Sequence, residues 1–158
     1  MKKIIPDYKT RQYTKDDYWF VYDVKKTVYR KYVEMNWGEW VEEAQKDMFK
    51  DFMYAHAKEI RIIELDGVKI GFFHGKNIDE KNYVQRNICI LPEYQGCGIG
   101  SSILHKVIQQ HKNQDIHLRC FKQNPVINLY KKLGFEVVEV LPHHFRMVLL
   151  RKNKNRPN

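Results

Sequence analysis

One stretch of the sequence decides the fold: Ile88-Cys89-Ile90-Leu91-Pro92-Glu93-Tyr94-Gln95-Gly96-Cys97-Gly98-Ile99-Gly100-Ser101. The apolar residues at its start predict a strand that ends at Pro92. Ile99, Ile103 and Val107 then recur at helical spacing, which predicts a helix directly after the glycines. A strand, a glycine-rich turn and a helix N-terminus together present backbone N–H groups to an anion. Glycine suits such a turn because a Cβ would keep phosphate oxygens away from the backbone.

Three phosphate-binding patterns compete for this turn. A Walker loop needs G-x-x-x-x-G-K-[ST], and no Lys lies between Gly96 and Ser102, so it is excluded. A dinucleotide-binding fingerprint needs G-x-G-x-x-G, but Ser101 stands at its third glycine. That fingerprint also wants an acid after the following strand, whereas Asp115 precedes it. The third pattern, Gln95-x-x-Gly98-x-Gly100, fits.

This third pattern resembles the pyrophosphate-binding loop of the GCN5-related N-acetyltransferases, the GNAT family. A second block, Asn124-Pro125-Val126-Ile127-Asn128-Leu129-Tyr130-Lys131-Lys132-Leu133-Gly134-Phe135-Glu136, is similar to that family's Asn…Leu-Tyr-x-x-x-Gly-Phe segment. The segments 32–38 and 143–147 are also similar to segments of one bacterial subgroup. Val126 stands where many members carry alanine, and its larger side chain is expected to crowd the pantetheine.

The resemblance implies direct acetyl transfer from acetyl-CoA to a primary amine, with no covalent enzyme intermediate. It implies that the main chain of the strand before the loop pairs with the pantetheine amides and that the loop amides hold the pyrophosphate. The implied cofactor-binding residues are Ile88, Cys89, Ile90, Gln95, Gly96, Cys97, Gly98, Ile99, Gly100, Ser101, Asn124 and Tyr130. An alternative function is a CoA-binding regulatory protein with the same fold and no useful activity.

Tyr130 is the candidate general acid, because it matches the tyrosine of the family motif. A tyrosine of pKa about 10 stays protonated and can donate to a departing thiolate whose thiol has a pKa of about 8.5. The amide N–H of Ile90 or of Leu91 is a candidate donor to the oxyanion of the tetrahedral intermediate. Cys97 is interpreted as a spacer in the glycine turn.

The amine acceptor is predicted to be cationic and recognised by an acidic segment. Residues 34–51 carry six acidic and two basic residues, a net charge of −4 within a chain of +9. Glu34 is the candidate to attract the ammonium and take its proton, although a solvated helix face also explains it. Trp37 and His144 are further candidates for the acceptor pocket, although core positions are the favoured interpretation of Trp37 and Trp40.

The order of elements predicts an α/β fold. Periodicity and turn signals give β-α-α-β-β-β-α-β-α-β-β, a mixed, mostly antiparallel sheet flanked by helices. The helices are expected at about 14–35, from Trp40 to Phe52, from Ile99 and at 124–133. The chain has 158 residues, so we expect a single domain over 1–150 and a basic, flexible tail over 151–158.

Composition bounds the setting and the partners. Three cysteines without a C-x-x-C pair argue against a disulfide framework or a zinc ribbon and favour a reducing, cytoplasmic location. No apolar run reaches the roughly 20 residues of a membrane span, and no signal-peptide core is seen. The seven histidines show no metal-ligand spacing, so no metal is expected. The expected partner is a small-molecule or protein amine; nucleic acid is disfavoured and a homodimer stays open.

Overall fold

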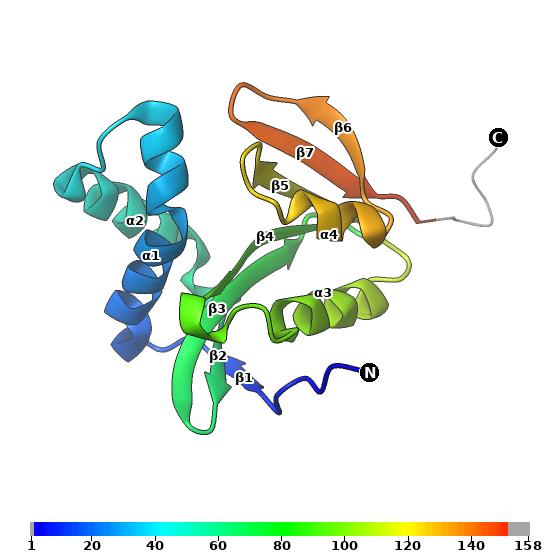
Figure 1. Ribbon diagram of the computed structural model, residues 1–158, viewed down its shortest axis with the longest axis horizontal. Coiled ribbons are helices and arrows are strands. Elements are labelled where there is room, and N and C mark those ends of the chain that lie inside the picture. The colour runs from blue at the N-terminus through cyan, green and yellow to red at the C-terminus, as the bar shows by residue number, and fades with distance from the viewer. Residues whose placement is uncertain (1, 152–158) are drawn as a thin grey trace. The chain divides into compact units, whose positions relative to one another are not determined.

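The computed structural model describes residues 2–151 (Figure 1). The strands and helices follow in the predicted order: β1 (Lys9–Gln12), α1 (Tyr18–Trp37), α2 (Glu42–His56), β2 (Ile60–Leu65), β3 (Val68–Asn77), β4 (Asn82–Ile90), α3 (Ile99–Gln110), β5 (Asp115–Phe121), α4 (Ile127–Lys132), β6 (Glu136–Val140) and β7 (His144–Leu149). Short 3₁₀ helices occur at Lys15–Asp17, Ala57–Glu59 and Pro92–Tyr94. The strands form one mixed sheet in the order β1-β2-β3-β4-β5-β7-β6. The predicted α/β class is confirmed.

The described chain divides into two compact units. The first is formed by the chain up to His74 together with Asn87–Gly100, and the second by Gly75–Arg86 together with the chain from Ser101 onward. Strand β3 passes from the first unit into the second, and β4 passes back. The single domain over 1–150 therefore stays a prediction about the whole chain.

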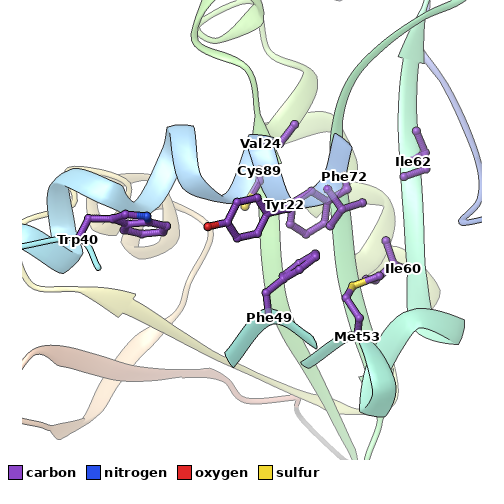
Figure 2. Close-up of a cluster of buried hydrophobic side chains, with 10 residues drawn as sticks. Tyr22, Val24, Trp40, Phe49, Met53, Ile60, Ile62, Phe72 and Cys89 are labelled. Carbon is purple, nitrogen blue, oxygen red and sulfur yellow. The ribbon is translucent and has the colours of Figure 1, made fainter. Parts of the chain in front are cut away.

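In the first unit, β1, β2 and β3 are antiparallel, and α1 and α2 pack against one face of β2 and β3 (Figure 1). Alternation along the strands places Ile60, Ile62 and Phe72 on that face, where all three are fully buried. Phe49 and Met53, one helical turn apart on α2, pack onto them (Figure 2). Trp40 joins the same core and is 8% exposed, whereas Trp37 is 56% exposed. The core interpretation is therefore confirmed for Trp40 and wrong for Trp37.

A buried carboxylate joins three elements of the first unit. The side chain of Asp17 is 2% exposed and accepts two hydrogen bonds from Arg11 at 2.8 and 2.9 Å. Lys69 lies 3.3 Å away, and the backbone N–H of Thr14 donates to the same carboxylate at 2.9 Å. Asp17 lies in the first turn of the helix expected from residue 14, which is a 3₁₀ turn that runs directly into α1. The Arg11 guanidinium holds the pKa of this carboxyl well below its usual range.

In the second unit, β5 and β7 form the longest antiparallel ladder, from Ile116↔Leu149 to Phe121↔His144, and β6 lies at the edge. Helix α4 is shorter than predicted because the Asn124 side chain accepts a hydrogen bond from the Val126 N–H at 3.0 Å. This Asx turn occupies the residues expected to begin the helix. Gly134 has φ 95° just after α4, a conformation that glycine commonly supplies at a helix C-terminus.

The C-terminal prediction lies almost wholly outside the described residues. Residues 152–158 of the expected tail are not among them. Arg151 is described, and its backbone N–H donates to Asp115 at 2.8 Å. His143 directly precedes β7, which begins at His144. Across the described part of the chain, no helix has the length and apolar character needed to span a bilayer.

Candidate functional site

Strand β4 directs alternate backbone groups to its two edges. The N–H of Leu91, the residue after the strand, donates to the carbonyl of Ile70 on β3 at 2.9 Å. Because backbone groups alternate along a strand, those of Ile88 and Ile90 point to the opposite edge. Of the two candidate oxyanion donors, the N–H of Leu91 is therefore already hydrogen-bonded to β3. The Ile90 carbonyl accepts a hydrogen bond from Gln95 Nε2 at 2.7 Å, which ties the glycine turn back to the strand.

The parallel ladder between β4 and β5 is short. It joins Asn82–Val84 to Asp115–His117, and both strands continue beyond it. The neighbouring antiparallel ladder, β5 with β7, has six pairs. A strand whose ladder on one side ends early has backbone groups beyond that point that need other partners.

The side chains of β4 separate by face. Asn87 Nδ2 donates to Tyr29 Oη on α1 at 2.9 Å, and Cys89, two residues on, is fully buried in the core that α1 covers. Burial raises the pKa of the Cys89 thiol to about 12, so it stays protonated. Ile88 and Ile90 lie on the other face, where their methyl groups come within 3.8 and 3.6 Å of an ideal Cβ on Gly100. The first turn of α3 is thus packed closely on the end of β4.

The glycine turn has the backbone conformation that the sequence predicts. Gly96 and Gly98 have φ of 73° and 93°, in the region that L side chains rarely adopt. Nothing lies within 4 Å of an ideal Cβ on Gly96, so that side of the turn is unobstructed. The turn leads into the twelve-residue helix α3, whose first N–H groups have no intrahelical partner. Cys97 Sγ donates to the Tyr94 carbonyl at 2.9 Å and belongs to the turn itself.

The N-terminal segment lies against this turn. Lys3 Nζ donates a hydrogen bond to the carbonyl of Gly96. Ile5 Cγ1 lies 3.3 Å from an ideal Cβ on Gly98, although Ile5 remains 45% exposed. No pattern in the sequence indicates this contact, since the segment has no periodicity and lies more than 90 residues away from the turn in the chain.

Tyr130 and Asn124 belong to the second unit. Tyr130 lies on α4, half-buried, with its ring 5.8 Å from that of Phe135. Its carbonyl accepts from the Phe135 N–H at 3.0 Å, which fixes the backbone where helix meets strand. Because Asn124 Oδ1 is used in the Asx turn, its side-chain amide NH₂ is the group with which it can contact a ligand.

The acceptor candidates lie in three different settings. Glu34 accepts a hydrogen bond from Arg30 one turn earlier on α1 at 2.8 Å, and its side chain is 38% exposed. Trp37, the last residue of α1, is exposed. His144 on β7 packs against Phe121 in a tilted arrangement with ring centroids 4.3 Å apart. Burial and the positive charge of Arg119 lower the pKa of His144, so its imidazole is neutral at pH 7.

One member of the acidic segment has a structural role. Glu42 accepts hydrogen bonds from Lys26 at 2.8 Å, Trp40 Nε1 at 2.8 Å and Tyr22 Oη at 3.0 Å. These donors lower the pKa of Glu42 to about 2. Glu42 therefore joins α1 to the start of α2. Glu43 beside it is exposed.

Comparisons with known proteins agree on one family. Residues 56–137 match the family described as acetyltransferase (GNAT) domain. An N-alpha-acetyltransferase of Sulfurisphaera tokodaii is 30% identical over 115 residues, covering 60% of this chain and 68% of the relative. A ribosomal protein bS18-alanine N-acetyltransferase of Haemophilus influenzae is 40% identical over 62 residues, 37% of this chain and 42% of the relative. The crystal structure of PaiA N-acetyltransferase from Thermoplasma acidophilum in complex with coenzyme A superimposes with a TM-score of 0.68 at 20% identity, over 93% of this chain and 99% of that one.

Proposed function

The chain belongs to the GNAT family of acetyltransferases and is an acyltransferase, and we propose that it transfers the acetyl group of acetyl-CoA directly to a primary amine. The observation that carries this proposal is the turn at Gly96–Gly98, which has both glycines at positive φ, open space beside Gly96, and a position immediately before the N-terminus of α3. Such a turn offers several N–H donors and a helix dipole to one pyrophosphate group.

The turn fits the pyrophosphate of CoA on geometric grounds. A Cβ at Gly96 would project into open space, which is the space that a phosphate approaching the backbone needs. We assign the pyrophosphate to the amides of Gln95–Ser101. The side chain of Gln95 has a second role, because its hydrogen bond to Ile90 anchors the turn on β4.

We assign the pantetheine arm to the edge of β4. The backbone groups of Ile88 and Ile90 point away from β3, and the ladder with β5 ends at Val84 and His117. Main-chain pairing with the pantetheine amides would use this edge without displacing a bond to β3. Cys89 contributes only its backbone, since its thiol is buried and protonated. The NH₂ of Asn124 is the group assigned to the cofactor arm in the second unit.

The transfer needs a proton acceptor, an oxyanion donor and a proton donor. An amine of pKa about 10.4 must lose a proton at pH 7, which costs roughly 4.6 kcal/mol for about 3.4 pK units. We propose that Glu34 accepts this proton, directly or through water. We propose that the N–H of Ile90 donates a hydrogen bond to the oxyanion of the tetrahedral intermediate. Tyr130 donates to the departing thiolate. Full transfer from Tyr130 is uphill by about 1.5 pK units, roughly 2 kcal/mol, so a hydrogen bond in the transition state is sufficient.

The acceptor class is a primary amine on a small molecule or on a protein. Two relatives are named for acetylation of α-amino groups, an N-alpha-acetyltransferase and an alanine N-acetyltransferase acting on a ribosomal protein. These names support a protein or peptide N-terminus as the first acceptor to test. The acidic segment 34–51 supports a cationic acceptor of either kind. The free cysteines support the cytoplasm as its location.

The experiment is an acceptor screen that follows release of free CoA thiol. The purified protein is mixed with acetyl-CoA and a panel of peptides with free N-termini, lysine peptides, polyamines and amino acids. We expect one class to release thiol well above the rate of hydrolysis without acceptor, with the acetyl group found on the amine by mass spectrometry. Tight acetyl-CoA binding with no turnover on any amine would instead support the CoA-binding regulator.

A further inference from the structure

Two histidines and a glutamate converge where α2 ends. His56 is the last residue of α2, and Glu59 follows three residues later in the 3₁₀ turn before β2. His74 on β3 pairs in register with Ile60, the first residue of β2, so the hairpin returns it to Glu59. All three residues belong to the first unit. The separation of His56 and His74 in the chain explains why no metal-ligand spacing was visible in the sequence.

The donor atoms of these side chains are close together. His74 Nε2 lies 2.6 Å from Glu59 Oε2, and His56 Nδ1 lies 3.3 Å from the same oxygen. All three donor atoms lie within 4.8 Å of one another. The two imidazole rings are 4.9 Å apart, and Phe52 packs against both, at 5.2 and 5.5 Å. The aromatic ring limits the orientations of both imidazoles.

The cluster has a buried side and an open side. The side chain of His74 is completely buried, whereas those of His56 and Glu59 are 21% and 27% exposed. An ion can therefore reach the donor atoms from solvent past His56 and Glu59 and meet a fixed ligand beneath them. A surface cluster of acids would offer no such fixed ligand.

From this arrangement we propose that His56, Glu59 and His74 bind one divalent transition-metal ion, with Zn²⁺ as the best fit. Two imidazoles and one carboxylate are a ligand set that Zn²⁺ takes in proteins, whereas Ca²⁺ and Mg²⁺ prefer oxygen ligands alone. The site is separate from the proposed acetyl-transfer residues and does not depend on the proposed function.

The two donor distances to Glu59 need only a small adjustment. Ligands about 2.0–2.1 Å from a tetrahedral Zn²⁺ lie roughly 3.3 Å from one another. The His56–Glu59 pair already has this spacing, and the His74–Glu59 pair must open by roughly 0.7 Å as the metal replaces their shared proton. The partly exposed Glu59 side chain can make that movement. A fourth position is left for water, and the bound ion would tie the end of α2 to β3.

The test is a Co²⁺ titration of the full chain without an affinity tag, followed by displacement with Zn²⁺. We expect saturation at one ion per chain, visible absorption bands of tetrahedral Co²⁺, and no thiolate-to-metal charge-transfer band. Zn²⁺ should abolish the spectrum and raise the melting temperature until one equivalent is bound. Absence of a saturable spectrum, or a thiolate band, would overturn the proposal in favour of a hydrogen-bonded His–Glu–His cluster or of cysteine ligands.

Variants assign the ion to this cluster. His56→Ala and Glu59→Gln change partly exposed side chains, and each should weaken Co²⁺ binding at least about tenfold. Their melting temperatures in EDTA verify that they fold. His105→Ala, an exposed histidine on α3, is the matched control and should leave the spectrum unchanged. Equal weakening by His105→Ala, or unchanged binding by both cluster variants, would contradict the assignment.

Discussion

Among single residues, Gly96 gives the sharpest test of the cofactor turn. Its φ of 73° is one that Asp and Asn tolerate better than other side chains, and its Cβ position is open. Gly96→Asp places a carboxylate beside the pyrophosphate, which costs at least about 1 kcal/mol, or about fivefold in affinity. Gly96→Asn has the same shape without the charge. We expect calorimetry to show weaker acetyl-CoA binding for Asp than for Asn; equal affinities would refute the phosphate assignment. Gly98 is less suitable, because a Cβ there meets Ile5.

Tyr130 is tested by removing only its hydroxyl. Tyr130→Phe keeps the ring that packs near Phe135 and deletes the group that assists thiolate departure. General acid catalysis contributes roughly 10²–10⁴-fold, so we expect kcat to fall within that range while the Kd of acetyl-CoA stays nearly constant. Steady-state kinetics with a slow acceptor, where chemistry limits the rate, measures this. A kcat equal to that of the parent would remove Tyr130 from the reaction.

Glu34 requires a control for surface charge. The ion pair of Glu34 with Arg30 competes with any contact between Glu34 and the amine. The experiment must therefore separate a direct effect of Glu34 on the amine from the effect of removing one negative surface charge. Glu34→Gln should lower kcat/KM for the amine and shift its pH profile, with no change in acetyl-CoA affinity. Glu43→Gln removes one exposed acid from the same segment without touching the structural Glu42 cluster. Equal losses in both variants would show that only general surface charge matters.

Among the elements, the junction of β1, the first 3₁₀ turn and β3 depends on Asp17. Its carboxyl pKa is lowered by Arg11, so this link contributes fully to stability at pH values well above the unfolded pKa of about 3.9, and the contribution is lost progressively as pH falls through that value toward the lower folded pKa. Asp17→Asn should cost roughly 1–3 kcal/mol at pH 7, less than for a fully buried pair because Arg11 is 37% exposed. The free energy of unfolding of the Asp17→Asn variant should also fall less between pH 7 and pH 3 than that of the parent. Asp16→Asn, the exposed neighbour, is the control, and urea titrations from pH 3 to 7 measure both.

Local sequence patterns predicted the elements because their causes are local. Alternating apolar residues such as Ile60 and Ile62 indicate the strand β2. Asp66-Gly67 is a typical hairpin turn, and both residues have positive φ in the structure. Gly134, also at positive φ, marks the end of α4. Where the structure depends on a contact between residues far apart in the chain, local sequence patterns did not predict it. The ion pair of Asp17 with Arg11 and the return of His74 to Glu59 both depend on strand register. For the site, the glycine turn was predictable from its motif, whereas the engagement of Leu91 with Ile70 was not.

At the scale of the whole molecule, cooperativity tests the single-domain prediction. The three tryptophans, Trp19, Trp37 and Trp40, all lie in the first unit, so their fluorescence reports on that unit alone. Circular dichroism reports on both units. Because β3 and β4 each contribute to both units, we expect the two urea transitions to coincide with one midpoint. A fluorescence midpoint clearly separate from that of circular dichroism would show two domains.

The contact of the N-terminal segment with the glycine turn bears on how the protein is prepared. Lys3 and Ile5 touch Gly96 and Gly98, so a fusion peptide joined ahead of Lys2 starts within a few residues of the turn. An oligohistidine leader there would also add imidazoles able to capture the very ions used as probes. A carboxyl-terminal label, removed by protease before titration, avoids both disturbances. A fusion peptide at the amino terminus would therefore alter the measured affinity for nucleotide thioesters, and the value would not be that of the enzyme alone.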